Sequence, residues 1–251
     1  MKPIEQHIQN QCHNKQKGLA LLLDPDKCTD VQRLHQTLQV AESGGVDYLF
    51  VGGSLLSTDQ LDQTLSGIRK HSQLPVILFP GSALQVSNQA DALLMLSLIS
   101  GRNAELLIGQ QVQAAPRIRA CGLETLPTGY MLIDCGSSTT ASYISQTMPI
   151  PNNKPEIAAV TALAGEMLGL RLFYLDGGSG ARVPVNKNLI AAVRAITKLP
   201  IIVGGGIRTF EDALQAYAAG ADIIVVGTAV EEDTDVLFDL CKAKKEVYQN
   251  A

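Results

Sequence analysis

Three glycine-rich segments in the C-terminal half of the chain have the composition of an anion-binding surface. They are residues 174–180 (YLDGGSG), 204–208 (GGGIR) and 227–228 (GT), and each follows a short apolar run. Glycine lets the backbone approach an anion without an intervening side chain, and a helix that follows such a turn directs its free N–H groups at the ligand. We therefore predict that these segments bind a phosphate group.

Polar side chains also stand where other apolar runs end. Asp24 follows the three leucines of LLLDPDK, Ser54 ends VGGS, and Asp134 follows YMLI. A carboxylate and a hydroxyl form a sparse oxygen shell of the kind that Mg²⁺ uses, because this ion keeps several waters and takes further ligands from substrate phosphates. We predict that Asp24 and Ser54 bind Mg²⁺. Asp24 could instead only cap its D-P-D-K turn.

Asp176 lies inside the first glycine-rich segment. A carboxylate in this place can accept a hydrogen bond or a proton from a substrate hydroxyl. It could also serve only as a turn residue. Both readings stay open at this point.

The elements that must position these residues are eight apolar runs, most of them followed by a segment of helical period. The runs are residues 19–23, 48–51, 76–79, 92–98, 130–133, 172–175, 201–203 and 223–226. Strands joined by crossover helices run parallel, and near-continuous Val/Ile/Leu runs are typical of a parallel sheet buried on both faces. The pattern predicts an α/β protein, a (βα)8 TIM barrel, in a single domain over residues 1–251. In such barrels the working face lies where the strands end, and a phosphate commonly binds after strands seven and eight.

Two connections depart from this regular plan. After the third run, Pro80-Gly81-Ser82 is followed by only a few residues before the fourth run begins at Ala92. We expect the third helix to be short or missing, which would leave the barrel open on one side. The segment 137–155 is long and rich in Ser, Thr and Pro, and we expect a functional loop over the mouth of the barrel.

Composition excludes several classes of function. The net charge of −4 gives no support for binding to nucleic acid, which normally needs a basic surface. The apolar runs are too short to span a bilayer, and the polar N-terminal segment contains no secretory signal, so we expect a cytoplasmic protein. The five cysteines show no C-x-x-C spacing and the four histidines no H-E-x-x-H spacing, which favours reduced structural thiols and surface histidines.

The ordered set of motifs LLLDPDK, VGGS, FPGS, ALLMLSLISGRN, YLDGGSGA, IIVGGGIRT and IIVVGTAV closely resembles the geranylgeranylglyceryl phosphate synthases, a family of barrel prenyltransferases. The resemblance extends from Gly18 to about Glu232. It implies transfer of a geranylgeranyl or similar polyprenyl group from its diphosphate to the 3-hydroxyl of sn-glycerol 1-phosphate. The products would be an ether-lipid precursor and diphosphate. The resemblance also implies a homo-oligomer, either a dimer or a hexamer.

Carried over position by position, the resemblance assigns a role to each motif. It puts Mg²⁺ on Asp24 and Ser54, and gives catalytic roles to Asp176 and Tyr174. It puts the glycerol phosphate on Tyr174, Leu175, Asp176, Gly177, Gly178, Ser179, Gly180, Gly205, Gly206, Gly227 and Thr228. The long prenyl tail would also need an apolar groove, which Phe79, Leu84, Leu94 and Leu96 could line, although each of them could instead be a barrel core residue.

Two departures from related patterns bear on substrate choice. The family usually has glutamate followed by alanine where this chain has Asp176-Gly177, so the carboxylate here is one methylene shorter. A related bacterial branch, the heptaprenylglyceryl phosphate synthases, typically has lysine two residues before the metal-binding aspartate and a shorter Y-S-G loop. Leu22 and the sequence GGSG occupy those places here, which favours the geranylgeranyl type.

Two other functions fit parts of the pattern. A phosphosugar isomerase or cyclase of the histidine-biosynthesis type would use Asp24 and Asp134, but such barrels tend to repeat the glycine loop after strand three, where this chain has FPGS. A non-catalytic phosphate-binding barrel would need no metal-binding acid across the mouth from its phosphate site.

Overall fold

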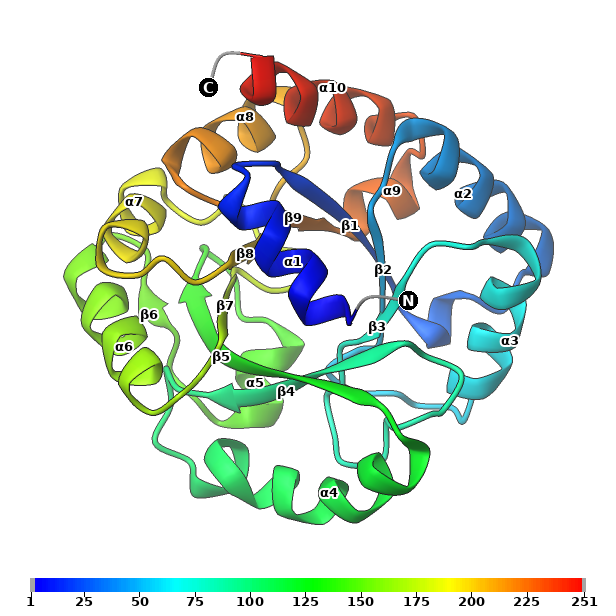
Figure 1. Cartoon of the computed structure of the whole chain (residues 1–251), viewed down its shortest axis with the longest axis horizontal. Helices are drawn as coiled ribbons and strands as arrows, with labels where there is room; N and C mark the ends of the chain where they lie inside the picture. The colour runs from blue at the N-terminus through cyan, green and yellow to red at the C-terminus, as the bar shows by residue number, and fades with distance from the viewer. Residues whose placement is uncertain (1–2, 250–251) are drawn as a thin grey trace.

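In the computed structural model, which describes residues 3–249, eight parallel strands close into a barrel (Figure 1). The strands are β1 (Gly18–Leu23), β2 (Tyr48–Val51), β3 (Val76–Leu78), β4 (Ala92–Leu98), β5 (Glu124–Asp134), β7 (Leu172–Asp176), β8 (Ile201–Gly204) and β9 (Ile223–Val226). Each pairs with the next in this order, and β9 pairs back with β1. The predicted TIM barrel is confirmed.

Helices surround the strands, as expected for βα units (Figure 1). They are α2 (Val31–Gly44), α3 (Leu61–His71), α4 (Gln110–Cys121), α6 (Pro155–Met167), α7 (Lys187–Ile196), α8 (Phe210–Ala219), α9 (Thr228–Glu232) and α10 (Val236–Gln249). A 3-10 turn, η1 (Pro25–Lys27), follows β1, and a π-helical turn, η2 (Glu105–Gly109), precedes α4. In the described part of the chain, no helix is long and apolar enough to cross a membrane.

No helix connects β3 and β4 in the described chain, as the sequence predicts, yet the barrel is closed at this point. The two strands pair in parallel, with Ile77 opposite Ala92 and Leu78 opposite Leu93. The expectation of an open side was therefore wrong, because a loop of a dozen or so residues is long enough to return the chain for parallel pairing. Gln85 braces this loop: its Oε1 accepts from Gly81 N at 3.0 Å and its Nε2 donates to Gly53 O at 3.0 Å.

The segment 137–155 is more ordered than the expected loop. It contains α5 (Thr140–Ser145) and the two-residue strand β6 (Ile150–Pro151), which pairs with the end of β5. A capping box starts α5, since Thr139 Oγ1 accepts from Ser142 N and Thr139 N donates to Ser142 Oγ. Local capping by Ser and Thr thus gives this segment a defined shape.

A helix that the sequence pattern did not reveal covers the N-terminal end of the barrel. This helix, α1 (Ile4–His13), lies across the ring of strands in Figure 1. Ile4 and Ile8 are buried among the interior side chains of the barrel, and Tyr48 donates its hydroxyl proton to Gln11 Oε1 at 2.8 Å. The opposite end, where the strands finish, is therefore the end available to a ligand.

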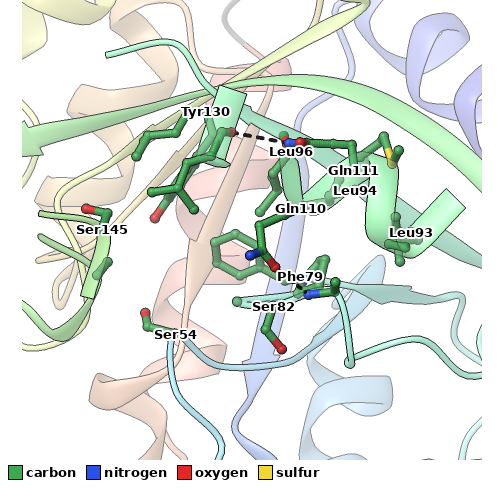
Figure 2. A pocket seen from close by; sticks show the side chains of 18 of the residues that line it. Ser54, Phe79, Ser82, Leu93, Leu94, Leu96, Gln110, Gln111, Tyr130 and Ser145 are labelled. Carbon is green, nitrogen blue, oxygen red and sulfur yellow. Dashed lines mark hydrogen bonds between the residues drawn. The ribbon is translucent and has the colours of Figure 1, made fainter. Parts of the chain in front are cut away.

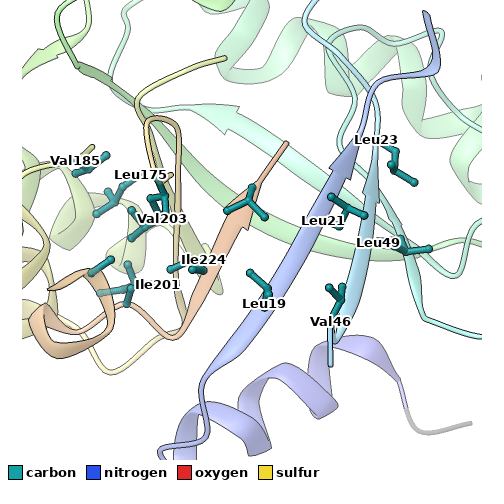
Figure 3. Packing of buried hydrophobic residues seen from close by; sticks show 14 of the residues in the cluster. Leu19, Leu21, Leu23, Val46, Leu49, Leu175, Val185, Ile201, Val203 and Ile224 are labelled. Carbon is teal, nitrogen blue, oxygen red and sulfur yellow. The ribbon is translucent and has the colours of Figure 1, made fainter. Parts of the chain in front are cut away.

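The core has two layers because successive side chains of a strand point to opposite faces. In β1, Ala20 packs inside the barrel, whereas Leu19, Leu21 and Leu23 pack in the layer between the strands and the helices (Figure 3). The outer layer fixes the helices against the barrel. The inner layer leaves its last side chains at the strand ends, where the candidate site lies.

Candidate active site

A polar cavity of about 250 Å³ lies at the carboxyl ends of the strands. Most of the residues predicted to bind metal, glycerol or phosphate line it, namely Asp24, Ser54, Tyr174, Asp176, Gly178, Ser179, Gly180, Gly205, Gly206, Gly227 and Thr228. The acidic turn after β1 and the glycine-rich turns after β7, β8 and β9 thus face the same space. A ligand in this cavity can contact both.

The glycine-rich turns pack against one another so closely that side chains are excluded. Gly205 has a φ of +83°, and a Cβ added there would lie 2.7 Å from Gly178 N. Gly206 has a φ of +76°, and its added Cβ would lie 2.5 Å from Val183 O. Ser179 and Thr228 join the first and last turns through their hydroxyls, which are 3.2 Å apart. The resulting wall of backbone amides and hydroxyls suits a phosphate group.

Asp176 is buried at the end of β7 and uses both carboxylate oxygens. Its Oδ2 accepts from the Tyr130 hydroxyl at 2.6 Å, and its Oδ1 accepts from Gly178 N at 2.7 Å. Burial raises the pKa of Asp176, while these two hydrogen bonds oppose the shift. The carboxyl is therefore a stronger proton acceptor than an exposed aspartate and is held in one orientation.

Tyr130 is a site residue that the sequence pattern did not reveal. It belongs to an apolar run, and nothing in its neighbours marks it as polar in function. Its place is decided by the β5–β7 register, which sets Tyr130 opposite Tyr174 and Leu132 opposite Asp176. Only the pairing of strands distant in sequence could have identified it.

Tyr174 points into the barrel and is almost fully buried. Its ring stacks on Phe79 with centroids 4.9 Å apart, and Tyr130 packs edge-on at 5.7 Å. A Cβ added at Gly204 would lie 2.5 Å from the Tyr174 hydroxyl, so glycine at that position makes room for this group. Burial raises the pKa of Tyr174, which keeps the hydroxyl protonated at neutral pH.

Two of the predicted glycerol phosphate contacts do not line the cavity. Leu175 is buried in the outer layer, because alternation along β7 turns it away from the side that carries Tyr174 and Asp176. Gly177 faces Cys135, whose Sγ would lie 2.8 Å from a Cβ added at Gly177. The side chain of Leu175 therefore packs against the helices, and Gly177 is a close-packing position.

Asp24 is partly buried and acts as the cap of the turn that follows β1. Its Oδ1 accepts from Asp26 N at 3.1 Å. The same oxygen would lie 3.4 Å from a Cβ added at Gly53, so the carboxylate also faces the Gly53-Ser54 segment. Burial raises the pKa of Asp24 and is the largest influence on it. Capping and a place on the cavity wall coexist in one residue.

The neighbouring Asp26 links the turn after β1 to the segment that follows Ser54 by hydrogen bonds. Its carboxylate accepts from the backbone and side chain of Ser57, both at 2.7 Å, and from Thr58 Oγ1 at 2.6 Å. These hydrogen bonds lower the pKa of Asp26 to about 2. Within residues 3–249, no three His, Cys, Asp or Glu side chains come together as a metal-binding group.

A second, apolar cavity of about 130 Å³ adjoins the polar one. Figure 2 shows Phe79, Leu94, Leu96 and Tyr130 in its wall, with Gln110 and Gln111 entering from α4. The cavity lies between the 80–86 loop, which replaces the third helix, and α4, while Ala141 and Ile144 of α5 add a further wall. Gly53, Ser54, Phe79 and Ala141 line both cavities.

One of the residues predicted for the apolar groove lies elsewhere. Leu84 is 78% exposed and is absent from the wall of the apolar cavity. It sits in the loop 79–91, where no helical or strand period fixes the direction of a side chain. The other three predicted leucine and phenylalanine residues line the cavity.

Asp134 also lies outside the site. It is exposed, caps its own turn by accepting from Gly136 N at 3.1 Å, and lines a shallow surface depression with Ser137 and Ser138. Asp24 faces the polar cavity instead. An isomerase that uses Asp24 and Asp134 as an acid and base pair is therefore not supported by the geometry.

Comparison with known proteins agrees with this arrangement. Residues 11–245 match the sequence model described as the PcrB family. The chain belongs to the PcrB family. Among PcrB relatives, the geranylgeranylglyceryl phosphate synthase of Spirosoma linguale is 54% identical, with 93% of this chain and 94% of the relative covered. The enzyme of the same name from Chitinophaga pinensis is 51% identical, with 90% of each chain covered.

This PcrB chain is also similar to a solved structure over nearly its whole length. The crystal structure of (S)-3-O-geranylgeranylglyceryl phosphate synthase from Thermoplasma acidophilum, in complex with its substrate sn-glycerol-1-phosphate, superposes with a TM-score of 0.91. The two sequences are 34% identical, and the match covers 98% of this chain and 100% of the other. An N-acetylmannosamine-6-phosphate 2-epimerase from Clostridium perfringens, at 12% identity and a TM-score of 0.57, shares the fold alone.

Proposed function

We propose that this PcrB protein is a Mg²⁺-dependent prenyltransferase that joins a geranylgeranyl or similar polyprenyl group to the 3-hydroxyl of sn-glycerol 1-phosphate, with release of diphosphate. One observation carries the proposal: a polar cavity with an acidic and a glycine-rich side opens beside an apolar cavity, and Ser54 and Phe79 line both. The high identity to named geranylgeranylglyceryl phosphate synthases supports it.

The glycine-rich side binds the phosphate of the smaller substrate. Gly205 and Gly227 line the cavity, so their backbone amides are the proposed donors to the phosphate, and the hydroxyls of Ser179 and Thr228, which are hydrogen-bonded to each other, lie on the same side. Such amides stabilise an anion without the desolvation of a charged side chain. The glycerol end of the substrate then lies toward the middle of the barrel mouth, near Asp176.

Asp176 orients the 3-hydroxyl and accepts its proton. As the bond forms between this oxygen and C1 of the prenyl group, the bond between C1 and the diphosphate breaks, and the proton passes to the Asp176 carboxyl. The hydrogen bonds from Tyr130 and Gly178 hold the carboxyl in position, and its raised pKa makes it a better base. Tyr174 packs beside Tyr130 and provides a protonated hydroxyl at the cavity wall.

The Asp24 carboxylate and the Ser54 hydroxyl would hold Mg²⁺. The donor set fits this ion, because it offers hard oxygen ligands and leaves the other positions to water and to substrate phosphate oxygens. Asp24 uses Oδ1 for the turn, and in the described chain its Oδ2 accepts no hydrogen bond. When bound, Mg²⁺ supplies positive charge that stabilises the departing diphosphate.

The prenyl tail occupies the apolar cavity. Phe79, Leu94 and Leu96 offer hydrocarbon contacts, and burial of each methylene from water contributes about 0.8 kcal/mol. A non-catalytic phosphate-binding protein would have no use for such a cavity next to its phosphate site. The adjoining cavities therefore favour a transferase over a sensor.

We further propose that the protein self-associates and acts in the cytoplasm. Helix α6 and the residue that follows it expose an apolar stripe of Ile157, Val160, Met167 and Leu168, and Val160 is 60% exposed. Exposed apolar surfaces of this kind are typical of protein interfaces. The five cysteines are free thiols, as expected for a reducing compartment.

A direct assay tests the proposed reaction. The purified protein is incubated with Mg²⁺, sn-glycerol 1-phosphate and farnesyl, geranylgeranyl or heptaprenyl diphosphate, and the ether product is sought by mass spectrometry. We expect product with geranylgeranyl diphosphate and little or none when sn-glycerol 3-phosphate replaces the 1-phosphate. Absence of product with every donor would reject the proposed function.

A further inference from the structure

Lys27 lies on the same turn as Asp24 and carries an ion pair that spans the mouth of the polar cavity. Its Nζ is 2.7 Å from Glu231 Oε2, on α9, and both residues line the polar cavity. They also line a neighbouring cavity between β1, α2 and α9, so the ion pair stands between the two spaces. Neither side chain has a role in the reaction as described above.

The positive charges of the polar cavity are divided between its two sides. Lys27 and Arg208 are the cationic residues in its wall, within the described chain. The Arg208 guanidinium donates to Ala181 O at 2.9 Å, which holds it beside the glycine-rich turns. Lys27 is on the acidic side, and its backbone N–H donates to Asp24 O at 2.9 Å. The side that would take the diphosphate thus has one cation besides the metal.

The Lys27–Glu231 ion pair is exposed enough for Lys27 to exchange Glu231 for another anion. The Lys27 side chain is 51% exposed and that of Glu231 is 31% exposed, and such surface pairs contribute little to stability. Arg33 also donates to the backbone carbonyl of Glu231, which holds this residue in place. Because the Glu231 carboxylate is partly exposed, water can solvate it when Lys27 moves to a ligand of higher charge.

We propose that Lys27 is a binding residue for the diphosphate of the prenyl donor, and that Glu231 holds it aside until the donor enters. The inference rests on the proposed function, because it assigns the second substrate to the Asp24 side of the cavity. A diphosphate carries more negative charge than one carboxylate and accepts several charge-assisted hydrogen bonds, so it competes successfully for the ammonium group.

The decisive experiment compares Lys27→Gln with Glu231→Gln. Both variants remove the same ion pair, so a purely structural role predicts equal effects on both. We expect Lys27→Gln to raise the KM for prenyl diphosphate and the Kd for inorganic diphosphate with Mg²⁺ by about tenfold or more, the loss typical of one charged hydrogen bond. Glu231→Gln should leave both constants unchanged or lower them, because Lys27 is then free. Lys27→Arg keeps the positive charge, so it should bind prenyl diphosphate and inorganic diphosphate nearly as well as the unaltered protein.

Binding controls separate this inference from the proposed function. The Kd for sn-glycerol 1-phosphate should change less than twofold in Lys27→Gln, and Lys242→Gln, which removes an exposed ion pair on α10, should behave like the unaltered protein. Equal losses in Lys27→Gln and Glu231→Gln, or a loss confined to glycerol phosphate binding, would overturn the inference. Because inorganic diphosphate binding is measured directly by calorimetry, the inference can hold or fail whether or not the ether is formed.

Discussion

At the scale of single residues, burial of Asp176 has two opposite consequences: it makes the carboxylate a stronger base and it lowers the stability of the fold. Its burial raises the energy of the charged form, and this cost is only partly offset by Tyr130 and Gly178. A carboxylate whose charged form is destabilised by burial is a stronger base. The residue should therefore be important for turnover and unfavourable for stability.

Asp176→Asn should lose activity and keep its stability at neutral pH. The folded-state pKa of Asp176 is raised, so its favourable contribution is complete below the unfolded pKa and is lost as pH rises through the folded pKa. Asparagine has no charge to bury and can still accept from Gly178 N. We expect kcat to fall by about 100-fold or more, while the Tm at pH 7 does not decrease.

The measurement uses steady-state kinetics together with thermal unfolding at pH 4 and pH 7. The Tm advantage of Asp176→Asn should grow between these two values. A variant that loses activity and also unfolds at much lower temperature at pH 7 would indicate a structural role for the carboxylate instead.

Asp24 gives a second prediction at this scale. In Asp24→Ala the carboxylate that would hold Mg²⁺ is missing, whereas the glycine-rich turns across the cavity are unchanged. We expect turnover to be abolished and the Kd for sn-glycerol 1-phosphate, measured by calorimetry, to stay within about twofold of the original. Activity that survives this change would show that the metal assignment is wrong.

At the scale of elements, α1 depends on a residue far away in sequence. Pro3 offers no side-chain cap, and the carboxylate of Glu124, at the start of β5, accepts instead from Ile4 N at 2.7 Å and Glu5 N at 2.8 Å. These are two of the N–H groups that a helix leaves unpaired at its start. Glu124 therefore holds α1, the helix that covers the N-terminal end of the barrel, in place.

Glu124→Ala should destabilise the protein without affecting the chemistry. We expect the free energy of unfolding to fall by about 1–2 kcal/mol, the usual cost of losing a helix cap, with kcat unchanged because the site lies at the other end. Urea unfolding measures the first and the prenyl transfer assay the second. Glu166→Ala, on the exposed surface of α6, serves as control and should shift stability by less than about 0.5 kcal/mol.

At the scale of the whole molecule, the apolar stripe on α6 is the feature that predicts assembly. Helix α6 belongs to the outer ring of helices and lies on the side of the barrel away from α2 (Figure 1). Val160→Glu places a charge in the middle of this stripe, and a charge buried in an interface without a partner is strongly unfavourable. We expect the proposed oligomer to dissociate toward monomers.

Light scattering coupled to size-exclusion chromatography measures this outcome. Val31→Glu, a comparably exposed valine at the start of α2, is the matched control and should leave the mass unchanged. An unaltered mass in Val160→Glu would place the interface elsewhere, and a mass change in both variants would point to general destabilisation.

The sequence by itself determined the features that depend on neighbours along the chain. Apolar runs marked the strands, a capping residue and a glycine bounded α8 at Thr209 and Gly220, and the glycine-rich segments marked turns that line the cavity. Asp24 directly follows β1 and Ser54 lies shortly after the end of β2, so both could be placed at the end of the barrel where the cavity lies. These are local properties of backbone conformation and side-chain alternation.

Only the tertiary structure decided which distant groups meet. The β5–β7 register brought Tyr130 to Asp176, Glu124 came to cap α1, and alternation along β7 turned Leu175 away from the cavity. Loop conformation left Leu84 in solvent, and parallel pairing closed the barrel where a helix is missing. Register and loop path depend on contacts between segments far apart in sequence, and no local pattern of residues encodes them.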